Sequence, residues 1–173
     1  GDKWILDGTK IFITNSATPM TLGSTVQVVS GEKNGKPEFT TFLMENDTPG
    51  FTQEPMNRKM MWRASNTGRL SFNNVELTND NMLGAPGQGS HIMLATLDGG
   101  RLSIAAMALG CAQGAYEMAL AYSKEREQFG KQICKFQAVS FKLADMAMKI
   151  EAARCLLYKA CRIKDAGMPF GKE

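Results

Sequence analysis

The pattern of apolar and polar residues changes near residue 84. Before that point, short apolar runs alternate with turn residues, which is typical of β-strands joined by tight turns. After it, Ala, Leu and Met dominate, and apolar residues recur every three or four positions, as in long helices. The sequence therefore predicts an α+β chain, with a β-domain over residues 1–84 and a helical domain over residues 85–173.

Two hairpins are predicted in the first half, each with apolar runs on both sides of a dipeptide that favours a tight turn. The pairs of runs are Trp4–Leu6 with Lys10–Thr14 and Val26–Val29 with Phe39–Leu43. The turn dipeptides are Asp7-Gly8 and Asn34-Gly35. Further strands are predicted at residues 69–72 and 75–77. A set of short antiparallel strands of this kind indicates a β-barrel or sandwich.

Two long helices are predicted in the second half, from about Gln88 to Phe129 and from about Phe136 to Ala166. The periodic stripe of the first is Met93, Leu97, Arg101, Ile104, Ala108, Cys111, Ala115, Ala119, Tyr122 and Arg126. The second helix has a seven-residue repeat, typical of a bundle seam, at Phe136, Leu143, Ile150 and Leu157. A second apolar row on it is Phe141, Met148 and Cys155. A helical hairpin from an incomplete four-helix bundle, with apolar surface on two sides, is therefore expected.

Composition excludes several classes of function. The 173 residues are 43% hydrophobic and 21% charged with a net charge of +3, and no stripe of Lys or Arg indicates nucleic-acid binding. No uninterrupted apolar run is long enough to predict membrane insertion. The single histidine and four cysteines form no CxxC pair, so no metal site is expected. Buried thiols in a reducing compartment are the simpler interpretation of the cysteines.

Candidate chemistry gathers where the first helix is expected to end. Arg126 offers a rigid, permanently charged fork that suits a phosphate or pyrophosphate. Phe129 adds a flat face, and Gln137 adds a donor and an acceptor. By residue type alone, Arg126 also fits a simpler role as a cation that caps the last carbonyls of the helix.

The spacing of two arginines predicts an oligomer. Arg101 and Arg126 lie seven turns apart on one helix face, which places them roughly 37 Å apart at about 1.5 Å per residue. One compact ligand group does not span that distance. If Arg126 serves a ligand whose reactive part lies near Arg101, the two arginines serve different ligand copies, as a symmetric oligomer allows.

Motifs along the whole chain resemble those of the acyl-CoA dehydrogenases. In the first half they are Leu6-Asp7-Gly8-Thr9-Lys10, Phe12-Ile13-Thr14-Asn15, Arg69-Leu70-Ser71-Phe72 and Leu83-Gly84. In the second half they are Arg101-Leu102-Ser103-Ile104, Gly110-Cys111-Ala112-Gln113-Gly114, Arg126-Glu127-Gln128-Phe129-Gly130, Phe136-Gln137 and Leu143-Ala144-Asp145-Met146. Their order matches that of the family's middle and C-terminal domains.

The resemblance implies FAD as cofactor and a short-chain acyl-CoA as substrate. It assigns Phe12, Ile13 and Thr14 to the flavin ring, with Thr14 donating toward the reactive edge. It assigns Arg126 to the flavin pyrophosphate, with Phe129 and Gln137 helping to hold the cofactor. It places the acyl-CoA against residues 98–101, which are Asp98, Gly99, Gly100 and Arg101. By residue type alone, Thr14 also fits an ordinary strand position, and Asp98 a solvated helix face.

The implied reaction oxidises the acyl-CoA to a 2-enoyl-CoA with hydride transfer to FAD. The resemblance also implies an internal fragment without the catalytic glutamate, inactive by itself. Some relatives have their base just before the arginine that corresponds to Arg101, where this chain has Gly100. Implied partners are an electron-transfer flavoprotein and copies of the same chain, in the bacterial cytoplasm or the mitochondrial matrix. Two alternatives stay open: a non-enzymatic assembly module, or an acyl-CoA oxidase-like flavoprotein.

Overall fold

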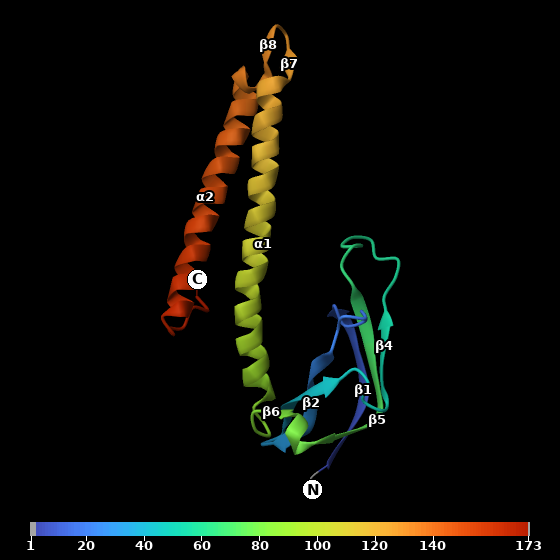
Figure 1. Cartoon of the computed structure of the whole chain (residues 1–173). Helices are drawn as coiled ribbons and strands as arrows, with labels where there is room; N and C mark the ends of the chain where they lie inside the picture. Colours follow the sequence, from blue (N-terminus) through green and yellow to red (C-terminus); the bar gives the residue numbers. More distant parts are fainter. Residues whose placement is uncertain (1–2, 173) are drawn as a thin grey trace. The chain divides into compact units, whose positions relative to one another are not determined.

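The computed structural model describes residues 3–172, which form two sets of strands and a helical hairpin (Figure 1). The order of elements is β1 (Lys3–Thr14), β2 (Gly23–Lys33), β3 (Lys36–Glu45), β4 (Phe51–Pro55), β5 (Thr67–Thr78), η1 (Asn79–Asn81), β6 (Met82–Leu83), α1 (Gly89–Glu125), β7 (Glu127–Gln128), β8 (Lys131–Gln132), η2 (Ile133–Lys135) and α2 (Gln137–Asp165). Two compact units divide between Leu94 and Ala95, inside the first turns of α1. The predicted α+β class is confirmed, whereas the domain boundary at residue 84 stays a prediction.

The first unit is a sandwich of two antiparallel sheets and, within the described residues, not a closed barrel. One sheet has the strand order β1-β5-β4 and the other β2-β3-β6. Alternate residues of the two sheets meet in one apolar core. Its buried members are Val26, Phe42, Met44, Phe51, Leu70, Phe72, Val75 and Leu77. The rings of Phe51 and Phe72 stack with centroids 5.2 Å apart.

One predicted hairpin is confirmed and the other is wrong. β2 and β3 pair around Asn34-Gly35, whose positive φ angles of 55° and 73° suit a two-residue turn. Residues 3–14 instead form the single strand β1, because Asp7 accepts a hydrogen bond from the Asn74 backbone N–H at 2.7 Å and lies opposite a bulge. The runs at residues 69–72 and 75–77 likewise belong to one strand, β5, and β4 was missed.

Close packing against β3 fixes the start of α1. A Cβ added to Gly89 would lie 2.8 Å from the Phe39 carbonyl carbon, so only glycine fits there without a shift. The Gly87 N–H donates to Thr40 Oγ1 at 3.2 Å, and the Ala85 N–H donates to Gln88 Oε1 at 3.1 Å. The glycine-rich run at residues 84–89 is therefore a turn into the helix.

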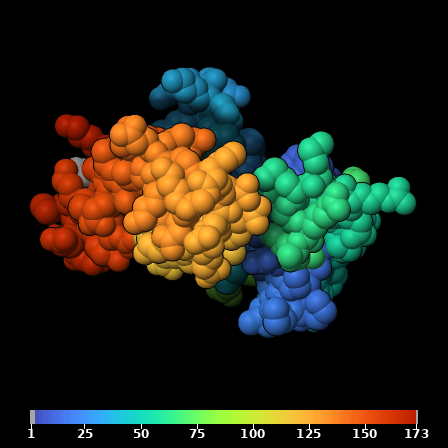
Figure 2. Space-filling model, turned by 90° about the horizontal axis from the view of Figure 1, so that it is seen from above, coloured from blue at the N-terminus to red at the C-terminus, as the bar shows by residue number. Residues whose placement is uncertain are grey.

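The second unit is an antiparallel helical hairpin whose end faces the viewer, in orange, in Figure 2. The predicted seam of α2 is confirmed, because Ile150 and Leu157 are buried against Leu109 of α1. The periodic stripe of α1 does not lie at this contact. Positions such as Leu97, Ile104 and Tyr122 are exposed, while Leu102, Leu109 and Tyr116 face α2.

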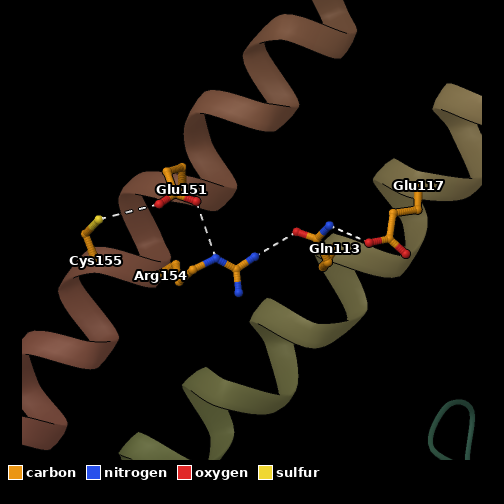
Figure 3. Close-up of polar contacts among 5 residues, drawn as sticks. All are labelled: Gln113, Glu117, Glu151, Arg154 and Cys155. Atoms are coloured by element: carbon orange, nitrogen blue, oxygen red, sulfur yellow. Dashed lines mark hydrogen bonds and ion pairs between the residues drawn. The ribbon is translucent and has the colours of Figure 1, made fainter.

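A chain of polar contacts joins the two helices (Figure 3). Arg154 of α2 donates from Nη2 to Gln113 Oε1 of α1 at 2.8 Å and from Nε to its neighbour Glu151 at 3.4 Å. Gln113 in turn donates to Glu117 Oε1 at 2.6 Å. Of these three hydrogen bonds, Arg154 to Gln113 crosses between the helices, and the other two orient its donor and its acceptor.

The expectation that the cysteines are buried is wrong. Cys111 and Cys155 are exposed, and Cys134 and Cys161 are half-buried, so none is a fully buried thiol. By length and composition alone, α1 qualifies as a candidate membrane span, although its sequence has no uninterrupted apolar run. One such helix is weak support for a membrane, because core helices of other proteins satisfy the same test.

We expect the 173-residue polypeptide to self-associate through the uncovered side of α2. Phe141 and Met148 of the second apolar row are 65% and 61% exposed, and Cys155 is exposed as well. Burying them against another copy removes apolar surface from water. Replacing Phe141 and Met148 by Asp should weaken association at least about tenfold in sedimentation at low micromolar concentration, because each charge resists burial. A double Lys142→Ala, Lys149→Ala variant lowers the net charge by the same amount and controls for charge. Unchanged association of the Phe141 and Met148 variant would contradict this prediction.

Candidate functional site

The end of β1 presents its three candidate residues in alternating directions. Ile11 and Phe12 together lie opposite one residue of β5, so the strand has a bulge there. Phe12 has a φ of 62°, which is uncommon for an aromatic residue, and its side chain is 70% exposed. Ile13 packs against the sandwich core, while Thr14 is exposed. The bulge therefore leaves an aromatic face and a hydroxyl at the surface, on either side of an anchored isoleucine.

Residues that the sequence analysis missed hold this strand end. Asn66 and Lys59, from the loop between β4 and β5, make hydrogen bonds to the segment after Thr14 and to the start of β5. No periodic signal marks either residue, because both lie in a loop, and the side-chain partner of Asn66 is 49 positions away.

Arg126 is the first residue after α1, which ends at Glu125 and not near Phe129 as predicted. Its backbone N–H still donates to Tyr122 O at 2.9 Å, and its carbonyl accepts from the Ile133 N–H at 2.9 Å. The side chain is exposed and makes no hydrogen bond or ion pair to any of residues 3–172. It therefore does not cap the helix carbonyls, and its guanidinium is available to another group.

The turn after Arg126 exposes a second aromatic face. Phe129 and Gly130 form the two-residue turn between β7 and β8, with φ angles of 53° and 76°. The Phe129 ring is 91% exposed and meets the Phe136 ring edge-on, with centroids 6.2 Å apart. The Lys131 Nζ lies 4.4 Å from the Phe136 ring centroid. The hairpin end is thus aromatic and cationic.

Gln137 begins α2 at the same end of the helical hairpin (Figure 1). Its side chain is exposed and has no hydrogen-bond partner within residues 3–172. The short strands β7 and β8 reverse the chain, so the structure brings Arg126, Phe129 and Gln137 to one end of one unit. The family resemblance assigned these three residues to one cofactor, and that role stays a prediction.

The candidate substrate residues lie on α1. Arg101 Nη1 and Asp98 Oδ1 form an exposed ion pair at 2.7 Å. A Cβ added to Gly100 would meet nothing within 4 Å, so no contact within the described chain requires glycine there. Asp98 and Arg101 also border a cavity of about 370 Å³ between the two helices, lined mainly by Leu102, Leu156 and other apolar side chains. Phe12, Ile13 and Thr14 belong to the other compact unit.

Comparison with known families agrees with these features. Residues 1–75 match the acyl-CoA dehydrogenase middle domain, and residues 87–173 match the acyl-CoA dehydrogenase C-terminal domain. The chain belongs to the acyl-CoA dehydrogenase family. The resemblance that its motifs predicted is therefore confirmed.

Known members of the acyl-CoA dehydrogenase family match almost the whole chain. The short-chain specific acyl-CoA dehydrogenase of Megasphaera elsdenii is 47% identical over 167 residues, which cover 96% of this chain and 43% of the relative. The solved structure of butyryl-CoA dehydrogenase from the same organism has a TM-score of 0.90 at 47% identity, covering 97% of this chain and 43% of that one.

A second solved structure, described as the electron transferring flavoprotein of Acidaminococcus fermentans, also has a TM-score of 0.90. It is 45% identical to this chain, and the matched region covers 98% of this chain and 44% of the chain in that structure. The chain thus spans less than half the length of the curated relatives it matches.

Proposed function

We propose that the intact protein is an FAD-dependent dehydrogenase that oxidises a short-chain acyl-CoA to a 2-enoyl-CoA. The observation that carries the proposal is the exposed Arg126 guanidinium without a partner in residues 3–172, in a chain of the acyl-CoA dehydrogenase family. The short-chain relatives support the substrate class. Bacterial relatives such as that of Megasphaera elsdenii support a cytoplasmic enzyme, and a mitochondrial relative from Rattus norvegicus supports the mitochondrial matrix as the alternative.

The residues present fit FAD. Phe12 and Phe129 both have left-handed backbone angles and exposed rings, an arrangement that costs free energy and is typical of ligand contacts. Arg126 would bind the pyrophosphate through its fork, and Gln137 would add a directional amide. Phe12 and Ile13 would line the ring, and the Thr14 hydroxyl would donate to its reactive edge.

The chemistry that FAD supplies when bound is acceptance of a hydride from the carbon β to the thioester. The chain orients the reactants. Asp98 and Arg101 would contact the acyl-CoA, and Gly99 and Gly100 leave the helix backbone open to close approach. Orientation of this kind converts an encounter between two molecules into a reaction within one complex.

The length of α1 supports a homo-oligomer. Arg101 lies within the helix and Arg126 one residue beyond it, so they are roughly 37 Å apart at about 1.5 Å per residue. We infer that Arg126 of one subunit serves the FAD of another. An electron-transfer flavoprotein is the proposed electron acceptor, and the structural match to a chain described under that name supports it.

The catalytic base is proposed to lie outside these 173 residues, because Gly100 precedes Arg101. We therefore expect the 173-residue polypeptide to show no turnover with FAD, butyryl-CoA and an artificial electron acceptor, whereas the intact protein should reduce the acceptor. Turnover by the polypeptide above a heat-treated control would reject the assignment of the base. Failure of the intact protein to bind FAD would favour the assembly module, and rapid reaction with oxygen would favour the oxidase.

A further inference from the structure

Asn66 makes three hydrogen bonds to the segment that follows Thr14. Asn66 Oδ1 accepts from the Ala17 N–H and Asn66 Nδ2 donates to the Ala17 carbonyl, both at 3.1 Å. The Asn66 carbonyl also accepts from the Asn15 N–H at 3.0 Å. One residue thus satisfies three backbone groups within three positions of Thr14. An amide is the side chain suited to this, because it donates and accepts in one plane.

Asn66 is itself held in place by Lys59. The Lys59 ammonium donates to the Ser65 carbonyl and to Thr67 Oγ1, the latter at 2.9 Å, so it ties down both neighbours of Asn66. Thr67 is the register partner of Thr14 in the β1–β5 ladder. The loop that carries Lys59 and Asn66 stands between β4 and β5 in Figure 1.

Ser16 and Gly68 pack closely beside the end of β1. Ser16 is buried and donates from Oγ to the Ile13 carbonyl at 2.9 Å. A Cβ added to Gly68 would lie 2.2 Å from Ser16 Oγ, so only glycine leaves room for it. Ile13 and Thr14 are consequently fixed from both sides, although both follow a bulge that would otherwise weaken the ladder.

We propose that Asn66, supported by Lys59, is a positioning residue that sets the placement of the Thr14 hydroxyl and the Phe12 ring at the flavin. This inference rests on the proposed function. It follows because Ile13 packs against the core while Phe12 and Thr14 are exposed, so the geometry of these two residues also depends on the hydrogen bonds that flank the bulge. Small displacements of a positioned group lower catalytic rates strongly.

The test uses the intact protein with the variants Asn66→Ala, Asn66→Asp and Asn57→Ala. Asn57 lies in the same loop and has no hydrogen bond within the described residues, so it is the matched control. Asn66→Ala should speed amide hydrogen exchange at Asn15 and Ala17 about fivefold to tenfold without FAD. The Ala17 N–H loses its side-chain acceptor, and the Asn15 N–H keeps a backbone acceptor that is held less firmly. With FAD it should shift the flavin absorption band and lower kcat about tenfold with little change in KM.

Asn66→Asp keeps the acceptor and loses the donor, so intermediate effects are expected, and it decides the question if the alanine variant does not fold. Equal exchange and equal flavin absorption in Asn66→Ala and Asn57→Ala would overturn the inference. Faster exchange with unchanged absorption and kcat would also overturn it, by showing a purely structural role. Absence of FAD binding already in the unmodified protein would reject the proposed function together with the inference.

Discussion

Arg126→Ala in the intact protein is expected to weaken FAD binding about 100-fold. The exposed guanidinium has no partner within residues 3–172 and would make a bidentate, charge-assisted contact with the pyrophosphate. Losing that contact costs about 2.7 kcal/mol, the equivalent of 100-fold. Arg126→Lys keeps the charge without the fork, so about a tenfold loss is expected. Titration of the apoprotein with FAD, followed by flavin fluorescence, measures both.

Lys124→Ala is the control, since Lys124 is an exposed cation in the last turn of α1 with no hydrogen bond or ion pair in the described chain. It should leave FAD affinity within about twofold, because an exposed, flexible ammonium lacks the planar fork that binds a pyrophosphate through two hydrogen bonds. Full flavin affinity of Arg126→Ala would show that Arg126 does not bind the cofactor. Equal losses in Arg126→Ala and Lys124→Ala would show a general effect of charge instead.

The second large effect is expected in the core of the sandwich. Leu70 is 2% exposed, on the central strand of its sheet, with β1 on one side and β4 on the other. Leu70→Ala removes buried methyl groups and leaves a cavity between the sheets, so it should lower the free energy of unfolding by about 3 kcal/mol. Urea unfolding of the 173-residue polypeptide, followed by circular dichroism, measures the change.

Leu22→Ala is the matched control, because Leu22 is 88% exposed in the same unit. Its effect on the free energy of unfolding should stay within about 0.5 kcal/mol. Similar losses for the two variants would contradict the assignment of Leu70 to the core. A loss in Leu22→Ala alone would indicate that residue 22 is covered by another copy of the chain.

The sequence predicted the elements whose geometry depends on residues close together in the chain. Asn34-Gly35 specified the β2–β3 hairpin, because few dipeptides adopt positive φ at both turn positions. The seven-residue repeat specified the buried side of α2, and the predicted ends of that helix lie within one residue of the observed ends. The motifs also sufficed to predict the family, since their order along the chain matches that of its two domains.

Tertiary contacts decided the rest. Asp7-Gly8 has the composition of a turn, yet a bond from the distant Asn74 keeps β1 continuous. The side of α1 that faces α2 could not be read from periodicity, because Ala, Gly and Met are spread around the whole helix. Asn66 gave no signal at all: its partners lie 49 positions away, and only the folded β5 brings them within hydrogen-bond distance. Sequence pattern thus fixed short-range geometry, whereas pairing between distant segments set the strand continuity, the helix contact and the support of the candidate site.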